Sequence, residues 1–331
     1  EVVARYGLGL GTPPLSIPHK RIEYMFAPNQ DVRRFGNRQL YNEYGMRNRP
    51  LEQWGGDRRI LVFGDSVLNG GNLTDHKALA TTIASLQSSE TTFGNVSAGS
   101  WGPDNILGWI ETYGLLGAKT AILVVSSHDA GDAPSFEALN PYTHPTKRPI
   151  TALSEGITRY VPRYLPEAIG QLIRAQPIKE EILTQNSGRD GIEIFPELFD
   201  IFSKNSIKVC IVLHATITEY FSGNFNMLDK FDQKAQAQMV PSIRMYEAME
   251  GQKLESFYRD DIHINERGQS VLADVLMECA DSAVIPKPRA RGMNRIFLAD
   301  HRGGGHGLQQ LRELGLGLTH RRPHDCTSKS V

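Results

Sequence analysis

The fold is decided by one stretch, Arg59-Ile60-Leu61-Val62-Phe63-Gly64-Asp65-Ser66-Val67-Leu68-Asn69-Gly70-Gly71. A short apolar run that ends at Gly and Asp is typical of a buried strand that enters a turn. Open α/β sheets carry their reactive groups just past the carboxyl ends of central strands. Ser66 stands at this position, so we predict that it is a nucleophile. The same residues also suit an ordinary turn or helix cap, so a nucleophilic serine needs partners elsewhere in the chain.

A second stretch supplies such partners, Tyr258-Arg259-Asp260-Asp261-Ile262-His263-Ile264-Asn265-Glu266-Arg267-Gly268. Asp260 precedes His263 by three positions, so both side chains fit on one turn before an expected helix. A serine oxygen needs a positioned base, and the imidazole needs an acceptor that fixes its tautomer. We therefore predict a catalytic group of Ser66, His263 and an aspartate of this turn, for which Asp260 is one candidate. Asp261 is the alternative acceptor, and a capped helix start with a surface histidine is the other interpretation of this stretch.

The pattern around these stretches predicts a three-layer α/β/α sheet of flavodoxin-like topology. After the first strand, further strands are expected at about 92–95, 120–125 and 207–213. Helices are expected at about 74–86, 104–116 (capped by Asp104), 195–204, 226–251 and 266–280. Strands that alternate with helices are the doubly wound pattern. The reactive stretches fall repeatedly where strands end, which agrees with this fold.

Composition divides the chain into a central domain with additions at both ends. Residues 1–58 are rich in Gly, Pro, Asn and Arg, and we expect an irregular lead-in with one hairpin, packed on the domain. The α/β domain is expected at 59–286. Its alternation lapses at about 132–193, which predicts a loop-rich insertion with a helix at about 166–175. Residues 287–331 are basic and contain His301, His306, His320 and His324, so we expect a flexible, disordered tail without a metal site.

Together with two intermediate blocks, the two stretches resemble the Ser-Gly-Asn-His (SGNH) hydrolases, also called the GDSL-like esterase and lipase family. The four blocks are Gly64-Asp65-Ser66-Val67, Asn95-Val96-Ser97-Ala98-Gly99-Ser100-Trp101-Gly102-Pro103, Ser126-Ser127-His128-Asp129 and Asp260-Asp261-Ile262-His263. Their order and spacing are more specific than any single block, and the resemblance covers about residues 60–280. It implies a serine esterase that needs neither a metal nor an organic cofactor, and the family spacing favours Asp260 over Asp261 as the partner of His263.

The resemblance also implies an oxyanion hole, with two departures from the family pattern. Its donors are the backbone N–H of Ser66, the backbone N–H of Gly99 or Ser100, and the side chain of His128. The family glycine falls on Ser100, which is a mild change because a backbone N–H is kept. The family asparagine is His128, whose ring donates only in the right tautomer. The other interpretation of His128 is a buried histidine paired with Asp129.

The substrate class rests on a weaker resemblance. The segment Asn42-Glu43-Tyr44-Gly45-Met46-Arg47 has the Asn-x-x-Gly-x-Arg pattern of members encoded with bacterial polysaccharide machinery. This implies an O-acyl ester as substrate, above all O-acetyl on a glycan, with hydrolysis favoured over transfer to another hydroxyl. It also implies the bacterial cell envelope or periplasm as the compartment. For the arginines of this region, solvent exposure or ion pairing is an equal alternative to sugar contact.

Several further residues are candidates for substrate contact: Asn69, Trp101, Tyr160, Arg163 and His214. Tyr160 and Arg163 lie in the expected insertion, where plain packing is the alternative. His214 follows an expected strand and is a rival base. It has no nearby Asp in sequence, so we rank it below His263 and expect a substrate-side or structural role.

Overall composition excludes several classes of protein. The 331 residues are 40% hydrophobic and 22% charged with a formal net charge of −1, which describes a globular protein without a global field for nucleic acid or membranes. No apolar run is long enough to span a membrane. The cysteines are Cys210, Cys279 and Cys326, with no metal spacing and no expected disulfide framework. Because residue 1 is Glu, we expect a processed product or a fragment.

Two other functions fit parts of the pattern. A non-catalytic carbohydrate-binding or scaffold protein would keep the fold while the oxyanion site has decayed at His128 and Ser100. The retained Ser66, Asp260 and His263 argue against it. A metal-dependent phosphoesterase could be drawn with the ligands Asp65, Asp129, Asp260 and His263, but it would leave Ser66 without a role.

Overall fold

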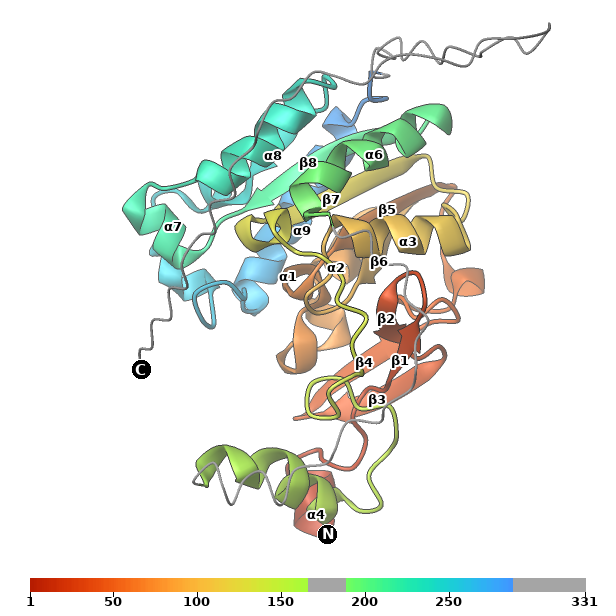
Figure 1. Ribbon diagram of the computed structural model, residues 1–331, viewed down its shortest axis with the longest axis vertical. Coiled ribbons are helices and arrows are strands. Elements are labelled where there is room, and N and C mark those ends of the chain that lie inside the picture. Colours follow the sequence, from red (N-terminus) through yellow and green to blue (C-terminus); the bar gives the residue numbers. More distant parts are fainter. Residues whose placement is uncertain (166–188, 288–331) are drawn as a thin grey trace, which may run out of the picture. The chain divides into compact units, whose positions relative to one another are not determined.

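Within the described residues, five parallel strands form the central sheet (Figure 1). The computed structural model describes residues 1–165 and 189–287; the expected helix at 166–175, the side chain of Arg163 and the tail from 288 onward lie outside the described residues. The strand order is β6-β5-β7-β8-β9. The strands are β5 (Arg58–Gly64), β6 (Thr91–Ser97), β7 (Thr120–Ser126), β8 (Lys208–His214) and β9 (Ser242–Arg244).

Helices cover both faces of the sheet, as the three-layer prediction requires (Figure 1). One layer holds α2 (Ala80–Gln87) and α9 (Glu266–Ser282), and the other holds α3 (Pro103–Tyr113), α6 (Gly191–Lys204) and α8 (Asn226–Gln236). Shorter helices are α1 (Ser66–Asn69), α4 (Ala152–Glu155) and α7 (Ile217–Ser222). The predicted α/β/α fold class is therefore confirmed.

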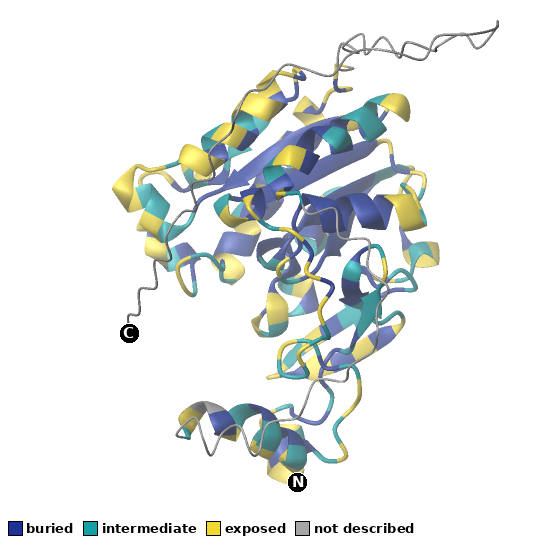
Figure 2. Ribbon diagram, viewed as in Figure 1, coloured by how far each residue is buried: buried dark blue, intermediate teal, exposed yellow. Residues whose placement is uncertain are grey.

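The alternation of side chains along each strand explains the two layers. Ile60 and Val62 pack with α2 and α9, whereas Leu61 and Phe63 pack with the opposite layer. This is the period of two that a strand imposes on its side chains. All of these residues are buried, and Figure 2 shows the sheet dark while exposed residues lie on the outer sides of the helices. The apolar run at the start of the first block is thus a strand buried on both faces.

The register brings the carboxyl ends of neighbouring strands together. Gly64 of β5 pairs with Ser97 of β6, and Ser126 of β7 pairs with His214 of β8. The segments that follow β5, β6, β7 and β8 therefore all leave the sheet at the same edge. This is the edge at which open α/β sheets place ligands.

Two expected helix boundaries are wrong. The segment 226–251 is not one helix, because α8 ends at Gln236 and the chain turns into β9. Met239 has a positive φ of 58°, and Pro241 disfavours a helical residue before it. Asp104 does not cap α3. Gly102 is the N-cap, Pro103 takes the first helical position, and Asp104 pairs with Arg21 at 3.0 Å.

The lead-in contains two antiparallel hairpins in the described structure, where the sequence predicted one. They are β1 (Ser16–His19) with β2 (Glu23–Phe26), and β3 (Gln30–Arg34) with β4 (Asn37–Tyr41). Ile22, Met25, Met46 and Trp54 are buried in the same core cluster as Leu61 of the sheet. The lead-in therefore contributes to the core that supports the strands.

The insertion contacts the lead-in through a buried ion pair. The Arg34 guanidinium donates to both carboxylate oxygens of Glu155 in α4, and its Nη1 lies 2.8 Å from Oε2. The Gly11 N–H donates to the same Oε2 at 2.6 Å. Arg34 is fully buried and Glu155 nearly so. A buried charge that loses its partner is costly, so this pair fixes how the two segments meet.

A disulfide joins the sheet to one helix. Cys210 of β8 and Cys279 of α9 are bonded, with a Cα–Cα distance of 5.5 Å. The sequence predicted no disulfide, and this prediction is wrong because the two cysteines meet only when α9 packs across β8. Cys326 lies outside the described residues. No helix in the described ranges combines the length and apolarity needed to cross a membrane.

Candidate active site

Ser66 is held at the start of a one-turn helix directly after β5. Asp65 caps that helix, since its Oδ1 accepts the Val67 N–H at 2.8 Å. Gly70 ends the turn with a φ of 72°, and a Cβ at this position would lie 2.8 Å from the Thr74 hydroxyl. Only glycine fits there without strain. As the first helical residue, Ser66 has a backbone N–H without an intrahelical acceptor.

His263 connects Ser66 to Asp260. Its Nε2 lies 2.9 Å from Ser66 Oγ, and its Nδ1 lies 2.8 Å from Asp260 Oδ2. Asp260 Oδ1 also accepts the backbone N–H groups of Ile262 and His263, which is the turn chemistry of an Asp at a loop. Asp261 instead accepts the N–H and hydroxyl of Thr218 at 2.9 and 2.7 Å. Of the two sequence candidates, Asp260 is therefore the partner of His263.

The Asp260 and His263 side chains are open to solvent, with exposed fractions of 58% and 42%. Partial burial raises the pKa of Asp260, but the hydrogen bonds from the His263 N–H, the His263 imidazole and the Ile262 N–H outweigh it. The pKa of Asp260 therefore lies below its usual value. A carboxylate that stays ionised can orient the imidazole and stabilise its cationic form.

Three side chains brace the loop that carries His263. His214 at the end of β8 bonds the Ile262 carbonyl through Nε2 at 2.7 Å. The Tyr258 hydroxyl donates to the Ala215 carbonyl at 2.7 Å, and Arg259 donates to the Leu73 carbonyl at 2.7 Å. His214 is fully buried, so it does not reach a substrate, and of its two expected roles the structural one remains.

A hollow of about 330 Å³, which we call the serine cleft, opens beside Ser66 and His263. Its other lining residues are Val67, Gly70, Gly71, Asn72, Leu73, Arg259, Asp260 and Ile264. This volume is at the small end of the range for ligand sites. The cleft accommodates a small acyl group more readily than a long one.

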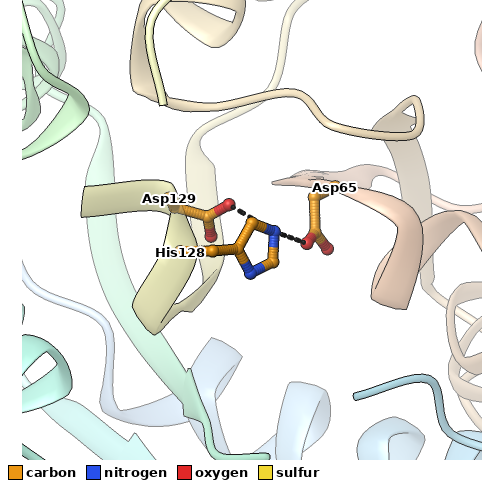
Figure 3. Close-up of side chains that lie close together, drawn as sticks. All are labelled: Asp65, His128 and Asp129. Atoms are coloured by element: carbon orange, nitrogen blue, oxygen red, sulfur yellow. Dashed lines mark ion pairs between the residues drawn. The ribbon is translucent and has the colours of Figure 1, made fainter. Parts of the chain in front are cut away.

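His128 stands in a cluster of carboxylates (Figure 3). Its Nε2 lies 3.1 Å from Asp65 Oδ2 and 3.3 Å from Asp129 Oδ1, with Asp132 at 4.0 Å. Its Nδ1 lies 3.2 Å from the Ser126 hydroxyl. Because both ring nitrogens have partners within this cluster, the geometry does not support the expected use of His128 as an oxyanion donor. The pairing with Asp129, the alternative from the sequence, is present, but the His128 side chain is 39% exposed and not buried as that alternative expected.

The carboxylates keep His128 protonated. Burial by itself lowers the pKa of His128, but the hydrogen bond with Asp65 and the charges of Asp129, Asp65 and Asp132 raise it to about 9. Burial and the nearby charge of Asp65 raise the pKa of Asp129. His128 is therefore the cation that offsets buried negative charge beside the cap of α1.

The same cluster is a candidate metal site by residue type. Ligand atoms of Asp65, His128 and Asp129 all lie within 4.8 Å of one another. A protonated imidazole has no lone pair for an ion, since metal binding requires the neutral ring. Binding of an ion at this position would therefore release the His128 proton.

The other expected oxyanion donors lie in the turn after β6. Ser100 is exposed and has a positive φ of 58°, and the Gly99 carbonyl accepts the Tyr24 hydroxyl. Since Ser97 pairs with Gly64, this turn starts from the same sheet edge as Ser66.

The remaining expected substrate contacts do not gather at Ser66. Asn69 and Trp101 are 2% and 3% exposed, and their side chains donate to the carbonyls of Ser97 and Tyr24. Both are structural, because burial removes them from the cleft. The Tyr160 hydroxyl accepts a hydrogen bond from Arg34 at 2.6 Å, which ties it to the lead-in. The side chain of Arg163 is outside the described part of the chain.

Sequence reasoning missed the role of Arg47. This guanidinium is completely buried, and it donates to the carbonyls of Gly71 at 2.7 Å and Thr74 at 2.6 Å as well as to that of Asn69. It is neither solvated nor available to a sugar. Arg47 holds the loop that follows Ser66, and the available signal was its place in the Asn-x-x-Gly-x-Arg pattern.

Comparisons with known proteins give the following picture. No protein-family model matches the chain, and no curated protein matches it. Similar solved structures include GDSL-type hydrolases and carbohydrate esterases, the family that the four blocks resemble. A member of the lipolytic G-D-S-L family from Veillonella parvula is 15% identical, with a TM-score of 0.39, over 67% of this chain and 97% of that one.

Two carbohydrate esterases are similar at comparable levels. A two-domain esterase active on acetylated mannans is 14% identical with a TM-score of 0.41, over 69% of this chain and 49% of that one. A family 3 carbohydrate esterase from Clostridium thermocellum is 12% identical with a TM-score of 0.38, over 67% of this chain and 94% of that one.

Proposed function

We propose that the chain is a serine esterase that removes acyl groups from a carbohydrate. One observation carries this proposal: hydrogen bonds run without interruption from Asp260 through both ring nitrogens of His263 to Ser66 Oγ. A serine hydroxyl is activated by an adjacent base whose tautomer a carboxylate fixes. Ser66 is also at the sheet edge where this fold places reactive groups.

In the proposed reaction, Ser66 Oγ attacks the ester carbonyl carbon and His263 Nε2 takes the hydroxyl proton. His263 then returns this proton to the leaving sugar oxygen, which leaves an acyl group on Ser66. Water, activated by the same imidazole, releases the acid and restores the serine. Asp260 stays ionised and stabilises the imidazolium, for which its lowered pKa is suited.

The oxyanion of the tetrahedral intermediate is assigned to backbone donors. These are the N–H of Ser66 at the start of α1 and the N–H of Gly99 or Ser100 in the turn after β6. Each such donor contributes about 3 kcal/mol to catalysis. We assign His128 a positioning role, because its charge holds Asp65, and Asp65 caps the helix that begins with Ser66.

The substrate class follows the resemblance of the Asn42 to Arg47 segment and the size of the serine cleft. A volume of about 330 Å³ suits a short acyl group such as acetyl on a sugar hydroxyl. The solvent-exposed His263 and Asp260 favour water as the acyl acceptor over a second sugar. The substrate is therefore an O-acetylated glycan.

The test is hydrolysis of a chromogenic acetyl ester by wild-type protein and by Ser66→Ala, with and without a chelator. We expect chelator-resistant activity in the wild type and a loss of at least about 10⁴-fold in the variant. Activity that disappears with chelator would favour the metal-dependent reaction. No activity in well-folded wild-type protein would favour a non-catalytic carbohydrate-binding protein. The observation that supports this second function is that His128, at the place of the family asparagine, is paired with Asp65.

A further inference from the structure

A second hollow, which we call the arginine pocket, has a volume of about 480 Å³ and lies outside the serine cleft. Its charged and titratable lining residues are Arg33, Arg38, Arg49, Asp75, His76 and Lys77. They come from the hairpin β3–β4, the segment after it and the loop before α2. The proposed ester chemistry uses none of these residues.

The pocket concentrates positive charge in a protein whose net charge is −1. In the described part of the chain, Arg33, Arg49 and Lys77 make no ion pair. Arg38 pairs with Asp31 at 2.7 Å. The two carboxylate oxygens of Asp75 accept the backbone N–H groups of Arg38 and Lys77 at 2.7 and 3.0 Å, so this carboxylate is hydrogen-bonded to the backbone. A local cationic surface of this kind attracts anions even when the whole chain does not.

Two further observations describe the field in the pocket. Arg33 and Arg38 face each other across the hairpin register, and like charges directly opposite destabilise a strand pair. Burial, together with the charges of Arg47, Arg38 and Arg49, lowers the pKa of His76 to about 4. Among the described residues, Arg38 is paired with the Asp31 carboxylate but Arg33 has no such pair, so an anion bound beside Arg33 would relieve the repulsion between the two arginines.

The arginine pocket and the serine cleft share one loop. Gly70 to Leu73 line the cleft, and Asp75 to Lys77 line the pocket. Adjacent Cα atoms are about 3.8 Å apart, so Leu73 and Asp75 are separated by at most about 8 Å. Arg47 and Arg259 hold this loop through the Thr74 carbonyl and hydroxyl. The two hollows therefore border the same short loop.

We propose that the arginine pocket binds anionic groups of a saccharide chain while an ester of the same chain reaches Ser66. Guanidinium and ammonium groups recognise carboxylate and sulfate oxygens through charge-assisted hydrogen bonds. The inference rests on the proposed function for the saccharide, and it adds that the glycan is acidic. The pocket itself can be tested without any ester hydrolysis.

The first experiment measures binding by calorimetry with the full chain carrying Ser66→Ala. The probes are hexagalacturonate for carboxylate, a sulfated dextran oligomer for sulfate, neutral maltohexaose, and a decamer of deoxythymidylate. We expect the acidic saccharides to bind at least about tenfold more tightly than maltohexaose, with affinity that falls between 50 and 500 mM salt because exposed charges are screened. The stronger of the two acidic probes identifies the anion.

The matched variants carry three Ala substitutions each. One replaces Arg33, Arg49 and Lys77 in the pocket, and the control replaces the exposed Lys208, Lys230 and Lys234 elsewhere on the molecule. We expect the pocket variant to lose about tenfold or more in affinity for hexagalacturonate and the control to lose little, with melting temperatures reporting that both fold. Arg49→Glu is a second pocket variant, which should weaken binding further than Arg49→Ala.

The second experiment compares kcat/KM on acetylated polygalacturonate with kcat/KM on the chromogenic acetyl ester. We expect this ratio to fall about tenfold in the pocket variant and not in the control. Equal loss of binding in both variants, equal affinity for maltohexaose, or equal affinity for the deoxythymidylate decamer would each overturn the proposal. An inactive wild-type protein that still binds hexagalacturonate through the pocket refutes the esterase and leaves the anion site standing.

Discussion

Two histidines meet carboxylates at the same edge of the sheet, in very different surroundings. On the loop before α9, His263 Nδ1 lies 2.8 Å from Asp260 Oδ2. Just after β7, His128 Nε2 lies 3.1 Å from Oδ2 of Asp65, which follows β5. Asp260 is 58% exposed and Asp65 is 1% exposed. The distances are alike, so the residue pair alone does not separate a base from a fixed cation.

The two histidines differ in the number of carboxylates around the ring and in the partner of the other ring nitrogen. His128 faces several carboxylates and already holds its proton at neutral pH, because its pKa is raised to about 9. His263 has one carboxylate on Nδ1 and places Nε2 on the Ser66 hydroxyl. A general base must be free to accept a proton in the reaction. In the proposed reaction, the two histidines therefore have opposite roles.

The strongest way to break this comparison is to remove His263. We expect His263→Ala to lower kcat on a chromogenic acetyl ester by about 10⁴-fold or more, because Ser66 loses its base. The exposed position makes a folding defect small, and the melting temperature checks this. Retention of more than a tenth of the wild-type rate would show that His263 is not the base.

A smaller effect is expected from His128→Asn, which places the family residue in the cluster. Asp65 and Asp129 lose the cation between them, the cap of α1 loosens and Ser66 shifts. A displacement of about 1 Å costs roughly 10²-fold in rate. The measurement is kcat on the same ester. Wild-type activity, or a loss as complete as that of His263→Ala, would contradict a positioning role for His128.

The pH profile separates the two histidines further. The pKa of His128 is raised above its unfolded value. The stabilisation that the charged imidazole gives to the folded site is therefore complete below pH 6.5 and is lost as the pH rises through about 9. We expect kcat/KM of the wild type to fall about tenfold for one pH unit above 9. His128→Asn should lack this alkaline decline. An identical decline in both proteins would assign it to another group.

The smallest change in rate is expected at His214, which acts only through the loop. His214→Phe keeps a ring against Tyr258 but leaves the Ile262 carbonyl without its donor. A buried acceptor without a partner costs about 1–3 kcal/mol of stability. We expect a lower melting temperature with kcat reduced only a few-fold. A loss of activity comparable to that of His263→Ala would instead make His214 part of the chemistry.

The parts predicted from sequence are those that short-range patterns determine. The strand before Ser66 followed from an apolar run. That an aspartate pairs with His263 followed from their places on one turn, but the choice of Asp260 over Asp261 followed only from the spacing of the family that the chain resembles. The carboxylates around His128 could not be predicted from a local pattern. Asp65 follows a different strand, and Asp132 comes only after the turn that carries His128. Asn69 and Trp101 were predicted to contact the substrate because their residue types suit a cleft. The sequence did not show that both side chains are buried.

The longer-range features needed the packed structure. β9 is too short to give a periodic signal, and the helix expected over that segment ends earlier because Pro241 cannot continue it. The role of Arg47 depends on carbonyls from Asn69, Gly71 and Thr74, which the chain brings together only when the lead-in folds against the loop.

The bond between Cys210 and Cys279 has a consequence for the chain before it folds. It closes a segment of 69 residues that includes the loop with Asp260 and His263. In an unfolded chain this closure removes conformational freedom worth about 4 kcal/mol. Whole proteins of this kind are stable by only about 5–15 kcal/mol. Reduction of this disulfide would therefore remove a large share of the free energy that keeps the protein folded around the loop with Asp260 and His263.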